Sequence, residues 1–130
     1  MTSAQTARPG VASRQFDKSR RLRRRAEFQT VFDTGQRVRG RFFTILVAAR
    51  NETTTRLGIV ASRKLGDAVR RNRAKRLIRE IFRQNPRHHG LKDVDVVVIP
   101  RVEMFSAPYR SLEEDFRSVL TRAIGRLRLS

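Results

Sequence analysis

The sequence predicts a single α+β domain whose elements follow the order α-β-β-α-β-α. Some segments have apolar residues at helical spacing. The segments between them either alternate apolar and polar residues or are continuously apolar, as strands are. A length of 130 residues suits one domain. Because only 38% of the residues are hydrophobic, we expect part of the chain to lie outside the core. Residues 1–18, which are polar and contain Pro9-Gly10, are predicted to be a disordered basic arm, and residues 19–130 form the domain.

Residues 26–33 predict a short first helix that ends before Gly35. A helix this short must pack on another element. Its Phe28 and Phe32 are four positions apart, either as core residues or as a platform for nucleic-acid bases. The arginine-rich run at 20–25 directly precedes this helix, and we interpret it as an arm that folds along phosphates.

Residues 41–50 and 56–62 predict two strands that form a hairpin around a turn at 51–54. An additional short strand is expected at 36–39. The residues expected on the core face of the two strands are Phe43, Ile45, Val47, Leu57, Ile59 and Ala61. The opposite face is small and partly polar, and it carries Thr44, Leu46, Val60 and Ser62. We interpret that second face as a groove for an unstructured nucleic-acid strand.

Residues 67–83 predict the clearest helix of the chain, with Asp67 as its N-cap and one apolar stripe. The stripe consists of Ala74, Leu77, Ile78, Ile81 and Phe82. Residues 93–100 form a nearly continuous apolar run, which indicates an inner strand. A last helix is expected over 111–127 with a capping box of Ser111 and Glu114, although Pro108-Tyr109 offers an earlier start.

The side of the 67–83 helix opposite its apolar stripe is densely cationic. This side carries Asn72, Arg76, Arg79 and Arg83, with Arg73 and Lys75 flanking them and Arg70 and Arg71 in the first turns of the helix. Glu80 is the only acid in this helix after the cap. A solvated helix face usually mixes charges of both signs, and these like charges repel one another. With a net charge of +18 for the chain, this pattern favours a polynucleotide partner over a solvated surface.

The sequence offers no catalytic group and no metal ligand set. Its acids are scattered, and the neighbouring Glu113, Glu114 and Asp115 are interpreted as stabilising the start of the last helix. His88-His89 has no evident third ligand, and the chain has no Cys for zinc or disulfides. The beginning of the chain has no apolar signal segment, and no long apolar stretch suggests a membrane. We therefore expect a cytoplasmic protein.

The stretch R-K-L-G-D-A-V-R-R-N-R-A-K-R-L-I-R-E at residues 63–80 resembles the signature of the bacterial ribonuclease P protein family. The similarity is centred on the triplet Arg71-Asn72-Arg73. Residues 21–32 resemble the first helix of that family, and Gly58 and Ser62 also fit its pattern. The resemblance spans about residues 20–127 and leaves only the arm outside.

This resemblance implies a two-layer sandwich like the second domain of ribosomal protein S5, with a left-handed βαβ crossover that carries the basic helix. That handedness is an exception to the usual rule. It also implies an RNA-binding subunit of ribonuclease P, which assists removal of the 5′ leader from precursor tRNA. The catalytic RNA would hold the Mg²⁺ ions and cut the phosphodiester bond. The partners would be that RNA and precursor tRNA, with no obligate protein partner and no membrane.

The resemblance also assigns two sets of binding residues. The cleft for the 5′ leader would include Phe28, Phe32, Thr44, Leu46, Val60, Ser62, Lys75 and Arg79. The surface for the RNA subunit would include Lys64, Arg70, Arg71, Asn72, Arg73 and Arg76. Some relatives have an aromatic residue in place of Leu46, so we expect an apolar contact there and no stacking.

Three alternatives remain open from the residues alone. A ribosomal-type protein that binds folded rRNA fits the basic composition equally well. A DNA-binding regulator could place the basic helix in a major groove, although no helix-turn-helix partner is evident. A free-standing protein nuclease would have to cleave without any RNA subunit.

Overall fold

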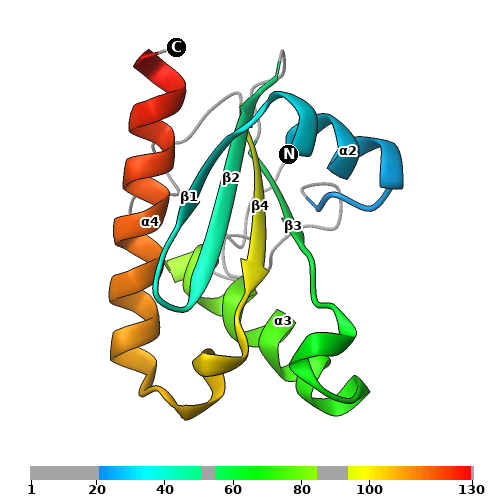
Figure 1. Ribbon diagram of the computed structural model, residues 1–130, viewed down its shortest axis with the longest axis vertical. Helices are drawn as coiled ribbons and strands as arrows, with labels where there is room; N and C mark the ends of the chain where they lie inside the picture. The colour runs from blue at the N-terminus through cyan, green and yellow to red at the C-terminus, as the bar shows by residue number, and fades with distance from the viewer. Residues whose placement is uncertain (1–20, 51–54, 85–93, 130) are drawn as a thin grey trace, which may run out of the picture.

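The computed structural model describes residues 21–50, 55–84 and 94–129, which form a four-stranded sheet flanked by helices (Figure 1). The predicted arm, the expected turn at 51–54 and the His88-His89 pair lie outside the described residues. The helices are α2 (Arg25–Thr34), α3 (Ala68–Gln84) and α4 (Tyr109–Leu129), with the short 3-10 helices η2 (Arg63–Leu65) and η4 (Val102–Ser106). The strands are β1 (Gln36–Arg39), β2 (Phe43–Ala49), β3 (Arg56–Ile59) and β4 (Val94–Pro100). The predicted α+β class and the additional strand are confirmed.

The predicted hairpin between the strands now labelled β2 and β3 is wrong. The sheet order is β1-β2-β4-β3, so β4 lies between them, antiparallel to β2 and parallel to β3. Five consecutive residues of β4, Val94 to Val98, are buried. This strand lies inside the sheet, and other parts of the protein cover both of its faces. Alternation predicts that a strand exists, but it does not identify the neighbouring strand. Helix α3 connects the parallel pair β3 and β4, which agrees with the expected βαβ crossover.

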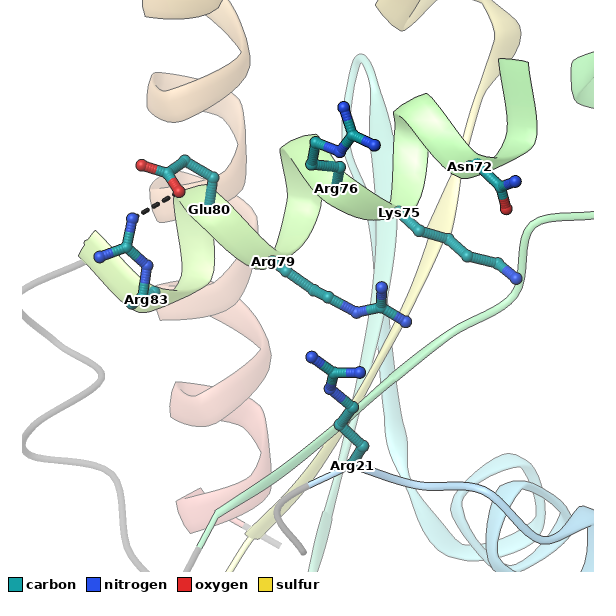
Figure 2. A pocket seen from close by; sticks show the side chains of 7 residues that line it. All are labelled: Arg21, Asn72, Lys75, Arg76, Arg79, Glu80 and Arg83. Carbon is teal, nitrogen blue, oxygen red and sulfur yellow. Dashed lines mark hydrogen bonds and ion pairs between the residues drawn. The ribbon is translucent and has the colours of Figure 1, made fainter. Parts of the chain in front are cut away.

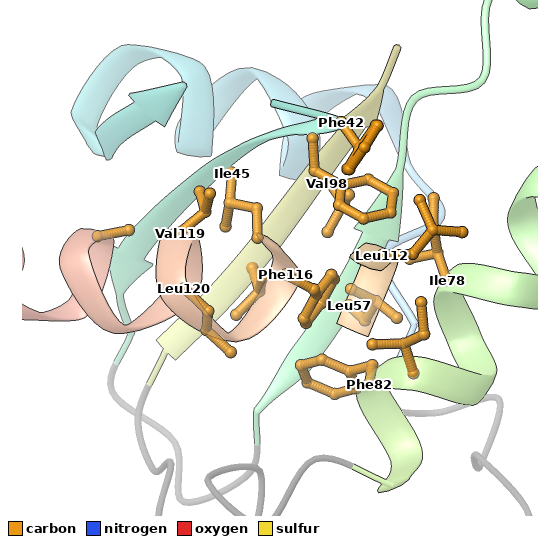
Figure 3. Packing of buried hydrophobic residues seen from close by; sticks show 14 of the residues in the cluster. Phe42, Ile45, Leu57, Ile78, Phe82, Val98, Leu112, Phe116, Val119 and Leu120 are labelled. Atoms are coloured by element: carbon orange, nitrogen blue, oxygen red, sulfur yellow. The ribbon is translucent and has the colours of Figure 1, made fainter. Parts of the chain in front are cut away.

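The main core lies between one face of the sheet and helices α3 and α4 (Figure 3). Phe116 of α4 meets Phe43 of β2 and Phe82 of α3 edge to face, with ring centroids 5.7 and 6.3 Å apart. Such edge-to-face contacts add to the free energy of area burial. The apolar stripe predicted for the helix at 67–83 faces this core. The predicted layer of helices on a layer of sheet is therefore confirmed for this face.

Helix α2 packs on the opposite face of the sheet and forms a second, smaller core. Val31 of α2 contacts a cluster made of Leu22, Leu46, Ala48 and Val97. Leu46 is only 2% exposed in this cluster. The small face of β2 is therefore divided: Leu46 and Ala48 lie in a core under α2, whereas Thr44 is only half-buried.

Two predictions about helix ends have different outcomes. Asp67 caps α3, since its Oδ1 accepts the Arg70 N–H at 3.0 Å. The capping box of Ser111 and Glu114 is wrong because α4 begins at Tyr109, and the Pro108 carbonyl accepts the Ser111 N–H at 3.0 Å. Proline fixes a φ suited to the start of a helix, so the earlier start is favoured.

Asp115 connects α4 to the turn between β1 and β2. Its carboxylate accepts the backbone N–H groups of Arg41, Phe42 and Phe43 at 3.0, 2.8 and 3.2 Å. This long-range role replaces the interpretation that Asp115 stabilises the start of α4. Within the described residues, no helix is long and apolar enough to cross a membrane.

Candidate nucleic-acid interface

The outer face of α3 presents cations without matching acids. Glu80 is already engaged by Arg83 and by the Gln84 amide. Among residues 21–50, 55–84 and 94–129, no carboxylate pairs with Lys75, Arg76 or Arg79. The helix keeps this face because its apolar stripe is buried in the main core, so packing offsets the repulsion among the cations.

A hollow of about 440 Å³ lies beside this face of α3 (Figure 2). Its lining residues are Arg21, Asn72, Lys75, Arg76, Arg79, Glu80 and Arg83. In Figure 2 the guanidinium groups of Arg21 and Arg79 extend toward one another. Burial, and then the charge of Arg21, lower the pKa of Arg79. Arginine nonetheless stays protonated in proteins, so two cations share this space. An anion between them would relieve their repulsion.

Arg21 reaches the hollow because the chain before α2 lies along the outer edge of β3. The Leu22 N–H donates to the Leu57 carbonyl at 2.9 Å, and Arg21 forms a parallel bridge with Leu57. Leu22 is buried in the smaller core, which fixes the backbone on this edge. Of the arginine-rich run at 20–25, Arg21 therefore lies beside the cationic face of α3.

Helix α2 is fixed by an ion-pair network that reaches the centre of the sheet. Glu27 accepts the N–H groups of Arg23 and Arg24, both at 3.0 Å, and the Arg24 bond is the main reason that its pKa is lowered. Arg56 of β3 donates to Glu27 at 2.7 Å and to both oxygens of Asp95 at 2.9 and 2.8 Å. The hydrogen bonds to Asp95 are the largest cause of the raised pKa of Arg56. These contacts hold the first turn of α2 against β3 and β4.

The two phenylalanines of α2 lie at the border between the smaller core and solvent. Phe28 is half-buried, and its ring packs on Gly58 of β3. Phe32 is 37% exposed one helical turn later. Neither ring is sealed in the interior, so both can present an aromatic edge or face to a ligand.

The residues assigned to the leader cleft are at least partly exposed, with the exception of Leu46. Phe28, Thr44, Val60, Lys75 and Arg79 are half-buried, and Phe32 and Ser62 are exposed. Leu46 is covered by α2 and lies in the smaller core.

The residues assigned to the RNA subunit lie on η2 and along α3. Lys64, Arg70, Asn72, Arg73 and Arg76 are exposed, and Arg71 is half-buried. The Arg70 guanidinium lies over the Phe105 ring at 4.3 Å, which restrains it. Asn72 and Arg76 line the same hollow as Lys75 and Arg79, so the two assigned surfaces are adjacent.

Sequence reasoning missed the roles of Arg56 and Asp95 in positioning α2. A signal was present, because an acid within the apolar run of residues 94–99 requires a buried partner. Within the part of the chain that the structure describes, no three His, Asp or Glu side chains gather as metal ligands.

Comparison with known proteins shows the family of this chain. A family model described as Ribonuclease P matches residues 16–124. The chain belongs to this family. The ribonuclease P protein component of Thermotoga maritima is 40% identical over 106 residues, which cover 80% of this chain and 81% of that protein. That of Syntrophus aciditrophicus is 35% identical over 105 residues, covering 81% and 87%.

Solved ribonuclease P proteins share the fold described above. The Thermotoga maritima structure superposes with a TM-score of 0.70 at 39% identity, covering 78% of this chain and 96% of that one. A Staphylococcus aureus ribonuclease P protein gives 0.71 at 33% identity, covering 82% and 96%. Membership of the ribonuclease P family assigns the chain to the RNA-binding proteins of tRNA processing.

Proposed function

We propose that this chain is the subunit of ribonuclease P that binds both the catalytic RNA and the 5′ leader of precursor tRNA. In this role it promotes endonucleolytic removal of the leader. The observation that carries the proposal is the unmatched cationic face of α3 beside an open sheet surface bordered by Phe28 and Phe32.

The leader side is suited to a single strand. Phe28 and Phe32 offer aromatic surface to bases, and stacking of this kind contributes roughly 1–3 kcal/mol per base without requiring a particular sequence. Lys75 and Arg79 stand beside the hollow with Arg21, where they can neutralise phosphates. A duplex would not expose its base faces to these rings, so the site favours an unpaired leader.

The RNA-subunit side consists of exposed residues on η2 and the first half of α3, namely the cations Lys64, Arg70, Arg73 and Arg76 and the neutral amide Asn72. Arginine forks suit phosphate and folded RNA, and the Asn72 amide can hydrogen-bond without charge. We assign the Mg²⁺ ions and the hydrolytic step to the RNA subunit and substrate. The chain contributes affinity and position.

Reconstitution tests this proposal. The purified protein is mixed with a bacterial ribonuclease P RNA and assayed on precursor tRNA at low Mg²⁺. We expect the protein to stimulate cleavage strongly, and the double variant Lys75→Gln/Arg79→Gln to lose much of the stimulation. Arg117→Gln/Arg122→Gln, at two exposed positions of α4, removes the same number of charges elsewhere and serves as the matched control. Absence of stimulation, or cleavage by rigorously RNA-free protein, would overturn the assignment.

A further inference from the structure

We propose that the leader-binding surface continues across β4 and β2 to β1 and ends at Arg39, so that this chain holds leader nucleotides beyond those at Phe28. The proposal rests on the proposed function, because it assumes that the leader lies on this face. It adds a residue that the comparison with the family did not assign, and it predicts a dependence on leader length.

The register of the sheet places four residues in one row across the strands. Arg39 of β1 is paired with Thr44 of β2, and Thr44 is paired with Ile99 of β4. The Val60 N–H donates to the Val98 carbonyl at 2.9 Å, which continues the β3–β4 register by one residue and sets Val60 beside Ile99. Side chains of directly paired residues project from the same face. Val60, Ile99, Thr44 and Arg39, here called the cross-strand row, therefore form one continuous strip.

The cross-strand row is the first row that helix α2 leaves uncovered. The neighbouring row contains Leu46 and Val97, which are buried under Val31. In the cross-strand row, Val60, Ile99 and Thr44 are half-buried and Arg39 is exposed. The other face of the same strands packs in the main core through Ile45 and Val98. The cross-strand row is thus a partly exposed strip of the sheet, and α2 borders it on one side.

Helix α2 crosses the sheet in the same direction as the row. Phe28, near its start, lies on Gly58 of β3, whereas the helix ends at Thr34, and Gly35 leads directly into the start of β1. Figure 1 shows α2 leading into β1 after passing the edge where β3 lies. A strand that enters beside Phe28 and follows this wall is therefore led toward Arg39.

Charge lies at both ends of the cross-strand row, and its middle is neutral. Lys75 and Arg79 stand near the β3 end with Arg21. At the β1 end, the Arg101 guanidinium donates to the Gly40 carbonyl at 3.4 Å, but it also pairs with Glu103 at 3.8 Å, so Arg39 carries the unmatched charge there. Within the described ranges, no acid pairs with Arg39. Val60, Ile99 and Thr44 would contact bases and riboses, and Arg39 at the far end would receive a phosphate.

The length of the cross-strand row predicts the leader length at which Arg39 begins to contribute to binding. From β3 to β1 there are three strand spacings of about 4.8 Å, or about 14 Å in all. At a stacked rise of about 3.4 Å per nucleotide this corresponds to about four nucleotides, and to fewer if the strand is extended. Leaders that stop near Phe28 cannot reach Arg39.

The experiment measures affinity of the reconstituted holoenzyme for precursor tRNAs whose leaders are lengthened one nucleotide at a time. The variants are Arg39→Gln and, as a control with the same charge change, Arg122→Gln on α4. We expect the Arg39→Gln holoenzyme to bind short-leader precursors like the wild type and long-leader precursors roughly tenfold more weakly. A tenfold loss is the lower end of the range for losing one charge-assisted hydrogen bond. The salt dependence should fall by about one phosphate contact for long leaders only.

Two results would overturn the proposal. No difference at any leader length would show that Arg39 contacts no RNA, and an equal loss at every length would place it on the tRNA body or the catalytic RNA. Phe28→Ala in the same series separates this failure from failure of the proposed function. If Phe28→Ala weakens leader binding while Arg39→Gln does not, only the extension to β1 is wrong.

Discussion

The ring of Phe28 lies directly on the backbone of Gly58, and a Cβ at Gly58 would fall 2.6 Å from the Cε1 atom of that ring. This relationship joins α2 to β3 at the place where the leader is proposed to enter. Gly58 does not adopt a left-handed backbone conformation, so the close approach of Phe28 is what requires glycine here.

Gly58→Ala should therefore displace Phe28 without straining the backbone. We expect the free energy of unfolding to fall by about 1–3 kcal/mol, the usual cost of overpacking, together with weaker binding of leader-bearing precursor tRNA. Thermal unfolding and binding assays check this. Gly125→Ala is the matched control, since nothing lies within 4 Å of its added Cβ. A helical Gly→Ala change should stabilise by about 0.5–1 kcal/mol. Unchanged leader binding in Gly58→Ala would argue against a role for the Phe28 position.

Phe32→Ala isolates stacking from core packing, because Phe32 is the more exposed of the two rings. Loss of one stacked base, at roughly 1–3 kcal/mol, should weaken binding of leader-bearing precursor by about 5- to 150-fold. Binding of mature tRNA should not change. Val69→Ala, at an exposed position on α3, is the control for removal of surface apolar area. Equal losses for precursor and mature tRNA would reject leader stacking.

Asp115→Ala should destabilise the fold, because three backbone N–H groups lose their acceptor. Hydrogen bonds to a charged group contribute roughly 1.5–3 kcal/mol, and we expect a total loss of about 2–4 kcal/mol. Chemical denaturation measures it. Glu114→Ala, at the preceding exposed position, should stay within about 0.5 kcal/mol of the wild type. Similar stabilities for the two variants would show that the carboxylate does not hold the turn.

The lowered pKa of Glu27 predicts an acid-dependent loss of stability. A depressed folded-state pKa stabilises the fold above the unfolded value of 4.5, and the contribution disappears as pH falls through the lower folded value. Glu27→Gln should therefore be less stable than the wild type at neutral pH and equally stable in strong acid. Denaturation of both proteins across this range checks the sign. A stability difference that did not depend on pH would contradict it.

The periodicity of the sequence predicted most helices and strands, because the alternation of buried and exposed positions within one element is visible in neighbouring residues. The stripe of α3, the cap at Asp67 and the small strand at residues 36–39 all depend on neighbours within a few positions. The cationic face of α3 was predictable for the same reason, since it is the complement of that stripe. The resemblance to the ribonuclease P family supplied the crossover, which no local pattern indicates.

The pairing of β2 with β4 was not predictable from alternation, because the choice of partner depends on a helix and strand that come later in the chain. For the same reason the sequence did not predict that α2 covers Leu46. In the sequence, Leu46 does not differ from the other residues of the small face. The cross-strand row that ends at Arg39 likewise exists only in the register, and its residues are far apart in sequence.

The salt dependence of binding to the ribonuclease P RNA tests the central claim most directly, namely that the unmatched cations of α3 lie against a polynucleotide. With six to ten phosphate contacts, affinity should fall roughly 10³- to 10⁵-fold between about 50 and 200 mM salt. Each Arg→Gln change at Arg70, Arg73 or Arg76 should reduce the slope by about one contact. A nearly flat salt response, unaltered by these substitutions, would contradict the account.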